Sequence, residues 1–345
     1  MSRSRTSLPT PYQHEDAWPW LAPEARPTSV DTDLSQWPRI TVITPSYNQG
    51  PYLERTIRSV LMQGYPNLEY LIIDGGSCDG SIDVIRKYEP WIDYWASEPD
   101  SGPAEAINKG LRRATGDILA WLNSDDVYHP GAVFAAVRAL QAESAGLVCG
   151  QCRLVSPDGK LIDTYTPHLP VTSRSLLMMW EYGYATPPQP TVFFRQAVPE
   201  KVGLLDEGLH YVFDYEYWLR ALGHFGFIFS PDVSADYLVH SESKTGQGWQ
   251  PFAREIGQIL PRYWARLDRW DQLKARVLGH RRVMVRPYLD HAFDAYKEGN
   301  DAEIGRWLHR AFWMDPTQII KRGNLSLYRR YVMRTLRGLR EALDA

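Results

Sequence analysis

A chain of 345 residues with 44% hydrophobic residues is long enough for a sizeable core, and at about 150 residues per domain its length predicts roughly two domains. A net charge of −3 and a pI near 6.3 argue against a nucleic-acid partner. Three cysteines argue against a disulfide framework and leave a structural zinc site short of ligands. No run approaches the ~18 consecutive apolar residues that cross a bilayer, and no apolar block follows Arg3 and Arg5 as in a signal peptide, so the sequence predicts a cytoplasmic protein.

The first part of the chain alternates strands with helices. Residues 1–37 lack periodicity and are expected to form an irregular N-terminal tail. Strands are predicted at Ile40–Thr44, Leu68–Asp74, Tyr94–Ser97 and Ile118–Asn123, and helices are predicted from Leu53 and at Ser81–Tyr88, Ala104–Ala114 and Ala132–Glu143. This order predicts an α/β fold with a Rossmann-like, mostly parallel sheet flanked by helices, because parallel neighbours need crossover connections.

The second part is less regular. Prolines interrupt the pattern after Val148 until a helix at Tyr215–Leu222, and from about Pro251 the chain reads as helical. We therefore expect a main domain at residues 38–250, with halves at 38–150 and 151–250, and a helical C-terminal extension at 251–345. Within the extension, Tyr288–Pro316 resembles a helical hairpin of the tetratricopeptide type, which must pack on the main domain or on a partner.

Two further segments allow more than one interpretation. Lys321–Ala345 holds seven Arg or Lys against two acids, with leucines interspersed. It is a solvated helix face or, less favoured, a basic amphipathic helix that makes peripheral contact with the inner face of an anionic membrane. Cys149-x-x-Cys152 has the spacing of a redox pair, but the apolar run LVCGQC favours a buried strand.

Three polar motifs follow three of the predicted strands: Thr44-Pro45-Ser46-Tyr47-Asn48, Asp74-Gly75-Gly76-Ser77-Cys78-Asp79-Gly80 and Asn123-Ser124-Asp125-Asp126. Each alone is an ordinary turn or helix-start sequence. Because ligands gather at the carboxyl ends of the strands in such sheets, the three motifs together predict one site.

These motifs, with Asp100–Gly110 and Thr115-Gly116-Asp117, run in order from Ile40 to His240 and resemble the inverting family 2 glycosyltransferases, which have the nucleotide-sugar-binding glycosyltransferase A fold. The resemblance implies transfer of a sugar, with inversion, from a nucleoside-diphosphate-sugar (UDP, dTDP or GDP) to a hydroxyl of a glycan or lipid-linked acceptor. It also implies a place in bacterial surface polysaccharide or lipopolysaccharide synthesis, with residues 151–250 supplying the acceptor side.

By the same resemblance, Tyr47 stacks on the donor base and Asp74 accepts a hydrogen bond from a base N–H. The other residues implied in donor-nucleotide binding are Pro45, Ser46, Asn48, Ser101, Gly102, Asn123 and Ser124. The alternative for Tyr47 is a packed loop aromatic. Asp79 is read as a helix N-terminal charge.

The resemblance also implies a divalent cation, Mn²⁺ or Mg²⁺, which stabilises the leaving diphosphate and is held by one or two carboxylates. Asp125 would be its principal ligand, because Asn123 replaces the usual first acid of the motif. His240 matches a late histidine near the metal or diphosphate, with a structural role as the alternative, and Lys244 could neutralise phosphate charge. Asp126 would bind sugar hydroxyls or brace the loop.

An acceptor hydroxyl needs a base, and Asp214 takes that position by resemblance. Phe213 replaces the acid that usually precedes it, Glu216 is the substitute, and the alternative is that Asp214 only caps a helix. The Asn123 and Phe213 departures support a competing hypothesis, a non-catalytic nucleotide-sugar-binding or scaffold protein. A nucleotidyltransferase ranks last, because Tyr47–Gly50 has no basic residue to hold a triphosphate.

Overall fold

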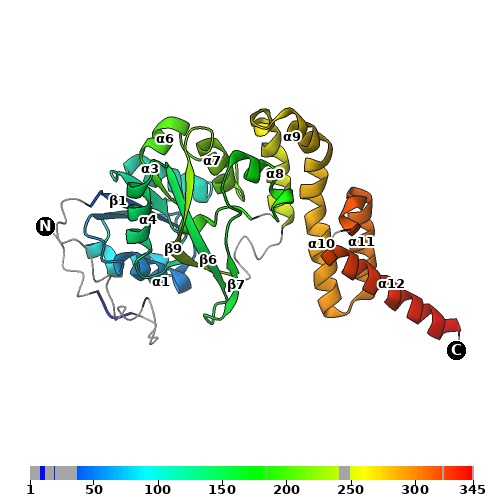
Figure 1. The fold of residues 1–345 in the computed structure, drawn as a ribbon. Helices are drawn as coiled ribbons and strands as arrows, with labels where there is room; N and C mark the ends of the chain where they lie inside the picture. Colours follow the sequence, from blue (N-terminus) through cyan, green and yellow to red (C-terminus); the bar gives the residue numbers. More distant parts are fainter. Residues whose placement is uncertain are drawn as a thin grey trace. The chain divides into compact units, whose positions relative to one another are not determined.

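The computed structural model describes residues 8–11, 19, 37–183, 185–240, 249–320 and 322–343. The chain forms two compact units, residues 1–243 and 244–345 (Figure 1). Most of the expected N-terminal tail lies outside the described residues, as does Lys244. Two described parts of the tail meet the first unit at Arg58, whose guanidinium donates to the carbonyl oxygens of Pro9 and Pro19.

The first half of the sheet is parallel, as the alternating pattern predicts. Four strands lie in the order β3-β2-β1-β4, and every neighbouring pair among them is parallel. Their bounds are β1 Ile40–Ser46, β2 Leu68–Asp74, β3 Tyr94–Ser97 and β4 Ile118–Trp121. The helices among and after them are α1 Gly50–Leu61, α2 Ser81–Tyr88, α3 Pro103–Arg113 and α4 Ala132–Ala142. Every residue of β1 and β2 is buried, as in a sheet covered on both faces.

Beyond β4 the sheet becomes mixed, continuing in the order β8-β6-β9-β5, with β7 paired to β6. Strand β8 runs antiparallel between β4 and β6, and β9 is parallel to β6. The bounds are β5 Val127–Tyr128, β6 Leu147–Val155, β7 Leu161–Tyr165, β8 Phe193–Arg195 and β9 Phe227–Leu238. Helices α5 Ser173–Leu177, α6 Ala197–Val202 and α7 Phe213–Ala221 belong to this half. The fold is therefore the predicted α/β sheet flanked by helices, with antiparallel strands added in its second half.

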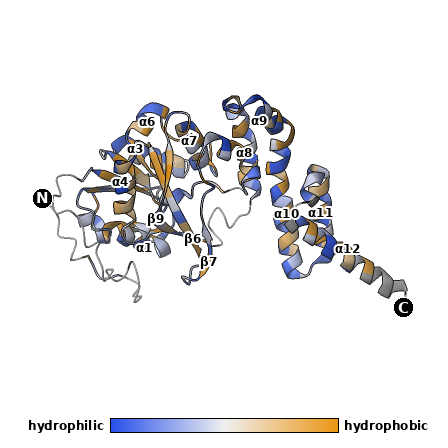
Figure 2. Cartoon of the chain, in the orientation of Figure 1, coloured by the Kyte–Doolittle hydropathy of each residue, from blue (hydrophilic) through white to orange (hydrophobic). Residues whose placement is uncertain are grey.

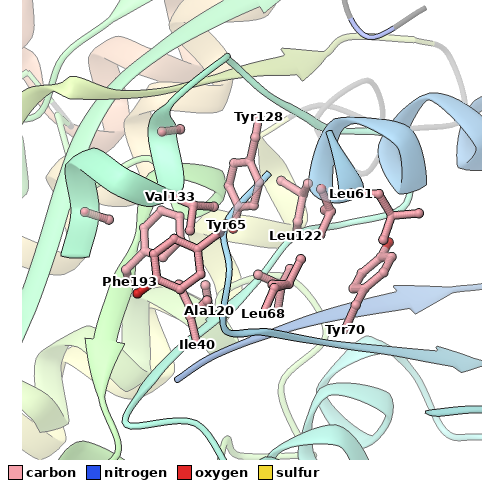
Figure 3. Close-up of a cluster of buried hydrophobic side chains, with 14 of the residues drawn as sticks. Ile40, Leu61, Tyr65, Leu68, Tyr70, Ala120, Leu122, Tyr128, Val133 and Phe193 are labelled. Atoms are coloured by element: carbon pink, nitrogen blue, oxygen red, sulfur yellow. The ribbon is translucent and has the colours of Figure 1, made fainter. Parts of the chain in front are cut away.

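Cores form on both faces of the sheet. Figure 3 shows one cluster, in which Tyr65 and Val133 lie near Ala120 and Phe193, and Leu61 lies near Tyr70. On the opposite face Trp121 of β4 stacks on Trp218 of α7, with ring centroids 5.1 Å apart. This contact fixes α7 against the strand that leads into the 123–126 loop.

Strand β6 decides between the two interpretations of the cysteines. Cys149 and Cys152 are both in this strand and are almost fully buried. Burial raises the pKa of both thiols. Buried, protonated thiols in a central strand are structural, so the redox interpretation is wrong.

The second unit is helical. It contains α8 Gln250–Tyr263, α9 Arg269–Lys274, a π-turn Ala275–Gly279, α10 His280–Glu298, α11 Asp301–Met314 and α12 Arg322–Leu343. Short 3₁₀ turns at Trp264–Arg266 and Pro316–Ile320 belong to this unit, and those at Glu89–Trp91, Met179–Glu181 and Gln189–Thr191 belong to the first unit. Figure 2 shows hydrophilic and hydrophobic residues alternating along these helices. None of the helices in the described residues is long and apolar enough to cross a membrane.

The hairpin expected at 288–316 is present as α10 and α11. The turn uses Gly299 with a φ of +74°, in the left-handed region that favours glycine. Ala292, Ile304 and Leu308 of the hairpin are buried together with Leu327 of α12. The hairpin therefore buries part of its apolar face against α12.

Candidate active site

Hydrogen bonds clamp the loops after β1 and β2 together. Asn48 has a φ of +51°; its backbone N–H donates to Ser77 Oγ (2.8 Å), and its Oδ1 accepts from the Cys78 N–H (3.0 Å). Asp79 accepts from the Gly50 N–H at 2.8 Å. Burial raises the pKa of Asp79, but hydrogen bonds from Ser81 and Gly50 hold it below its usual value. Asn48 and Asp79 therefore brace the two loops.

Tyr47 lies at the surface of this clamp with its side chain 61% exposed. One edge of its ring approaches Gly75. A Cβ at Gly75 would lie 3.2 Å from Tyr47 Cδ2 and 2.8 Å from Asp100 Oδ2. The bare backbone of Gly75 lets the ring and the carboxylate approach each other, and the exposed ring is available for a base to stack on.

Asp74 lies beneath, at 0% exposure. Its carboxylate accepts hydrogen bonds from Gly76 N (3.1 Å), Ser77 N (2.9 Å), Ser77 Oγ (2.5 Å) and Ser97 Oγ (2.7 Å). A base N–H can reach Asp74 only if one of these donors gives way. Pro45 and Ser46 are buried in β1, and the Ser46 carbonyl accepts from Gly75 N at 2.8 Å.

Asp100 is the functional candidate that sequence reasoning quoted without giving it a role. Its carboxylate is half-buried at the edge of Gly75, and its Oδ1 accepts from Gly102 N at 2.9 Å. Burial raises the pKa of Asp100. Ser101 instead turns to its own helix, where its N–H and Oγ both donate to Glu105 Oε2 (2.8 and 2.7 Å). The signal for Asp100 was its place in a polar motif directly after β3.

The 123–126 loop meets the end of β9 through an acid–histidine pair. Asp125 Oδ2 lies 3.1 Å from His240 Nε2, and the two side chains are 19% and 4% exposed. The pairing of β5 with β9 carries His240 to this position. Tyr52, which sequence reasoning missed, packs its ring on His240 with centroids 4.7 Å apart. Tyr52 is in the first turn of α1, so the start of α1, the 123–126 loop and the segment after β9 meet at this pair.

Asp125 and His240 offer a carboxylate oxygen and an imidazole nitrogen, two ligand types that a divalent cation takes, and the two atoms lie at hydrogen-bonding distance from each other. Within the part of the chain that the structure describes, no group of three His, Cys, Asp or Glu side chains could hold a metal by itself. Phosphate and water oxygens would complete such a site.

The position of Asp126 suits the second role expected for it, which is to hold the 123–126 loop in place, and not the binding of sugar hydroxyls. It is 1% exposed, and its Oδ1 accepts from Leu238 N at 3.3 Å. Burial, with the nearby Asp125 charge, raises its pKa well above the usual value. Ser124 is also buried, at 4% exposure. Neither side chain is exposed to solvent, as a side chain that binds a substrate would be.

Asn123 is held by a relay of amides that includes Gln189, another residue missed from the sequence. Asn123 Nδ2 donates to Gln189 Oε1 (2.9 Å) and to Asp126 Oδ2 (3.3 Å). Gln189 Nε2 in turn donates to the Trp121 carbonyl at 2.8 Å. Both amide hydrogens of Asn123 are thereby used, which leaves its Oδ1 as the acceptor pointing away from these partners.

At the start of α7 the structure separates the two acids. Glu216 is 3% exposed, and each of its carboxylate oxygens accepts from Arg220 Nε at 2.9 Å, so it is a structural partner. Asp214 is half-buried at the second position of the helix. The N-cap is Val212, and Asp214 Oδ1 accepts from the Tyr215 N–H at 2.7 Å, so Asp214 bonds the first turn of α7 from inside the helix, and a helix-start role stays open beside that of the base.

Contacts tie the segment before Asp214 to the donor-side loops. Asn108 of α3 exchanges hydrogen bonds with the backbone of Leu205 (2.9 and 3.0 Å), and His210 Nδ1 lies 3.6 Å from where a Cβ would stand on Gly102. Burial raises the pKa of Tyr165, and the nearby Asp214 charge adds to that rise. Asp214 therefore lies close to the end of β7.

Comparison with known proteins agrees with this geometry. The family model described as "Glycosyl transferase family 2" matches residues 41–200. The chain is 35% identical over 193 residues to an uncharacterized glycosyltransferase of Mycobacterium tuberculosis (strain H37Rv), covering 54% of this chain and 70% of that protein. It is also 36% identical over 136 residues to a putative teichuronic acid biosynthesis glycosyltransferase of Bacillus subtilis, covering 38% of this chain and 54% of the relative.

Solved structures agree in fold. The Staphylococcus aureus TarS fragment 1-349 in complex with UDP-GlcNAc superposes with a TM-score of 0.55 at 16% identity, covering 87% of this chain and 92% of that chain. The Pyrobaculum calidifontis mannosyltransferase in complex with GDP-Man and Mn²⁺ gives a TM-score of 0.55 at 18% identity, covering 87% and 86%. The fold is thus that of the glycosyltransferase A class. The chain belongs to glycosyl transferase family 2 and is a glycosyltransferase.

Proposed function

We propose that this glycosyltransferase is metal-dependent and transfers a sugar, with inversion, from a nucleoside-diphosphate-sugar to an acceptor hydroxyl. The observation that carries the proposal is the Asp125–His240 pair, a carboxylate and an imidazole 3.1 Å apart beside the first turn of α1. Carboxylate and imidazole are ligand types that a divalent cation takes, and the donor's own phosphates would help to hold it. The Mn²⁺ in the Pyrobaculum calidifontis complex supports a metal of this type.

For the donor, we place the base on Tyr47 and the diphosphate toward Asp125. The exposed Tyr47 ring beside Gly75 offers the stacking surface, with Asp100 at its edge. Structures of similar fold hold UDP-GlcNAc and GDP-Man, which makes UDP and GDP the nucleotides to test, beside the dTDP that the family resemblance also implies. Asn123 Oδ1, oriented by Gln189, is placed to accept from a donor hydroxyl or a water.

The reaction needs a proton acceptor and stabilisation of the leaving group. Asp214 would take the proton of the acceptor hydroxyl, since Glu216 is committed to Arg220. A divalent cation, when bound, would offset the charge that develops on the diphosphate. A single base on the acceptor side fits direct displacement at the anomeric carbon, hence inversion. On this proposal Asp125 and His240 hold the diphosphate end of the donor in place.

We further propose that the product is a bacterial surface polysaccharide or lipopolysaccharide, made at the cytoplasmic face of the membrane on a glycan or lipid-linked acceptor. The similarity to a putative teichuronic acid biosynthesis enzyme supports the polysaccharide class. Membrane contact through the C-terminal basic helix stays a prediction; α12 exposes Leu325, Val332 and Leu336. In functional terms we assign residues 38–150 to the donor, 151–250 to the acceptor and 251–345 to an extension.

Calorimetric titration with UDP, GDP and dTDP, each with Mn²⁺ and with a chelator, tests this proposal. We expect one diphosphate to bind only with metal, and Asp125→Ala to abolish that binding. Asp83→Ala is the matched control, because Asp83 is an exposed carboxylate on α2. If wild type binds none of the diphosphates, the alternative of a non-catalytic scaffold with the same fold gains support.

A further inference from the structure

The second unit has an exposed apolar surface at α9 and the π-turn, just before α10 begins. Trp270, Leu273 and Val277 are 77%, 53% and 57% exposed. Trp270 and Leu273 are three residues apart on α9 and share a face, and Val277 follows in the π-turn that joins α9 to α10. These three residues form the α9 patch. Large apolar side chains gathered on one surface are a sign of an interaction site.

Cations surround the α9 patch. Residues 262–286 contain eight Arg or Lys and two acids. Arg269, Lys274, Arg276 and Arg281 are all exposed beside the apolar residues. Of the two acids, Asp271 is 4% exposed and lies 3.5 Å from Lys274, and Asp268 caps α9 by accepting from the Asp271 N–H. The surface therefore combines an apolar centre, a tryptophan and an excess of positive charge.

We infer that the α9 patch binds the surface of an anionic lipid bilayer. A basic helix with Trp and Leu on one face lies in the membrane interface, and its cations are attracted to acidic headgroups. A second copy of the chain fits less well, because a two-fold contact through the same patch would bring arginine against arginine. This inference rests on the proposed function in one respect: membrane binding would bring the enzyme to a lipid-linked acceptor.

The α9 patch and the C-terminal basic helix can be tested separately. The α9 patch precedes α10, whereas α12 packs near the other end of α10, where Arg330 donates to the Tyr296 hydroxyl (Figure 1). The 19 residues of α10 span about 28 Å at 1.5 Å per residue. Substitutions in one surface therefore leave the other intact.

The experiment is co-sedimentation of the full chain with vesicles of phosphatidylcholine alone and of phosphatidylcholine with phosphatidylglycerol. We expect binding to the anionic vesicles. Trp270→Ser/Leu273→Ser should lower the partition coefficient roughly tenfold or more, since apolar burial is lost. Lys274→Gln/Arg276→Gln should lower it about 25-fold, at about fivefold per cation.

Trp313→Ser is the matched control, because Trp313 on α11 is 72% exposed in the same unit. It should bind vesicles as the wild type does. Three results would overturn the inference: no binding of wild type to anionic vesicles, loss of binding in Leu325→Ser/Leu336→Ser with none in the α9 variants, or Trp270-dependent self-association without vesicle binding. Donor binding by calorimetry should be unchanged in every variant, so failure here is distinct from failure of the proposed function.

Discussion

The amide relay at Asn123 makes a prediction against the family pattern: restoring the usual acid, by Asn123→Asp, should destabilise the metal-free protein. The substitution would set a carboxylate against Gln189 Oε1 and the buried Asp126 carboxylate, where an amide now donates to both. Gln189 cannot simply reverse, because its Nε2 donates to the Trp121 carbonyl.

The magnitude follows from the bonds. Asn123→Ala loses two hydrogen bonds, a cost of about 2 kcal/mol. Asn123→Asp loses the same bonds and sets a second acid beside Asp126, whose pKa burial already raises, and an acceptor against Gln189 Oε1, for a total of about 3–5 kcal/mol. At about 2–4 °C per kcal/mol for a unit of this size, the melting temperature should fall further in the Asp variant than in the Ala variant.

Thermal and chemical denaturation of the two variants in chelator, and again with Mn²⁺, measures this. We expect Mn²⁺ to restore part of the loss in the Asp variant, which offers the cation another carboxylate, and none in the Ala variant. If Asn123→Asp is as stable as the wild type in chelator, the two hydrogen bonds from Asn123 do not stabilise the protein as we argue.

Three more predictions concern the site and its frame. Asp214→Asn should lower kcat at least 100-fold with donor affinity unchanged, whereas Glu216→Gln should lower the melting temperature; equal effects on kcat would contradict the assignment of the base. Gly75→Ala should weaken donor binding at least tenfold, since the new Cβ displaces the Asp100 carboxylate and presses on the Tyr47 ring, and calorimetry would show it. Burial raises the pKa of Glu69, but bonds from Thr and Arg side chains hold it below its usual value, so its stabilisation is present above the unfolded pKa and is lost as pH falls through the folded one. Glu69→Gln should therefore destabilise by about 2 kcal/mol at pH 7 and by progressively less below pH ~4 in pH-dependent denaturation.

Local patterns predicted the first half of the fold well. The expected strands at 68–74 and 94–97 and the helix at 81–88 have those bounds in the structure. Continuous β-branched strands and amphipathic helices are set by residues near one another in the chain. Strand β8 was not predicted, because its three residues carry no period and are strands only by pairing with β4 and β6.

For the candidate site, the sequence predicted which loops come together but not which hydrogen bonds their side chains make. The motif order singled out Tyr47, Asp125 and His240, and in the structure Tyr47 is exposed while Asp125 pairs with His240; their roles stay predictions. It could not show that Asp74 already receives four hydrogen bonds, nor that Gln189 orients Asn123. Those facts depend on contacts between segments far apart in the chain, which no single-segment pattern contains.

The buried guanidinium of Arg58 sets a practical limit on trimming this protein. Arg58 is 5% exposed and donates to the Pro9 and Pro19 carbonyls as well as to the Tyr88 hydroxyl. A shortened protein that begins at the first strand would leave a charge in the first unit without two of its acceptors, at a cost of about 1–3 kcal/mol for each. Pro9 and Pro19 thus belong to the folding unit, and expression trials that remove the residues ahead of the first strand should yield less soluble protein.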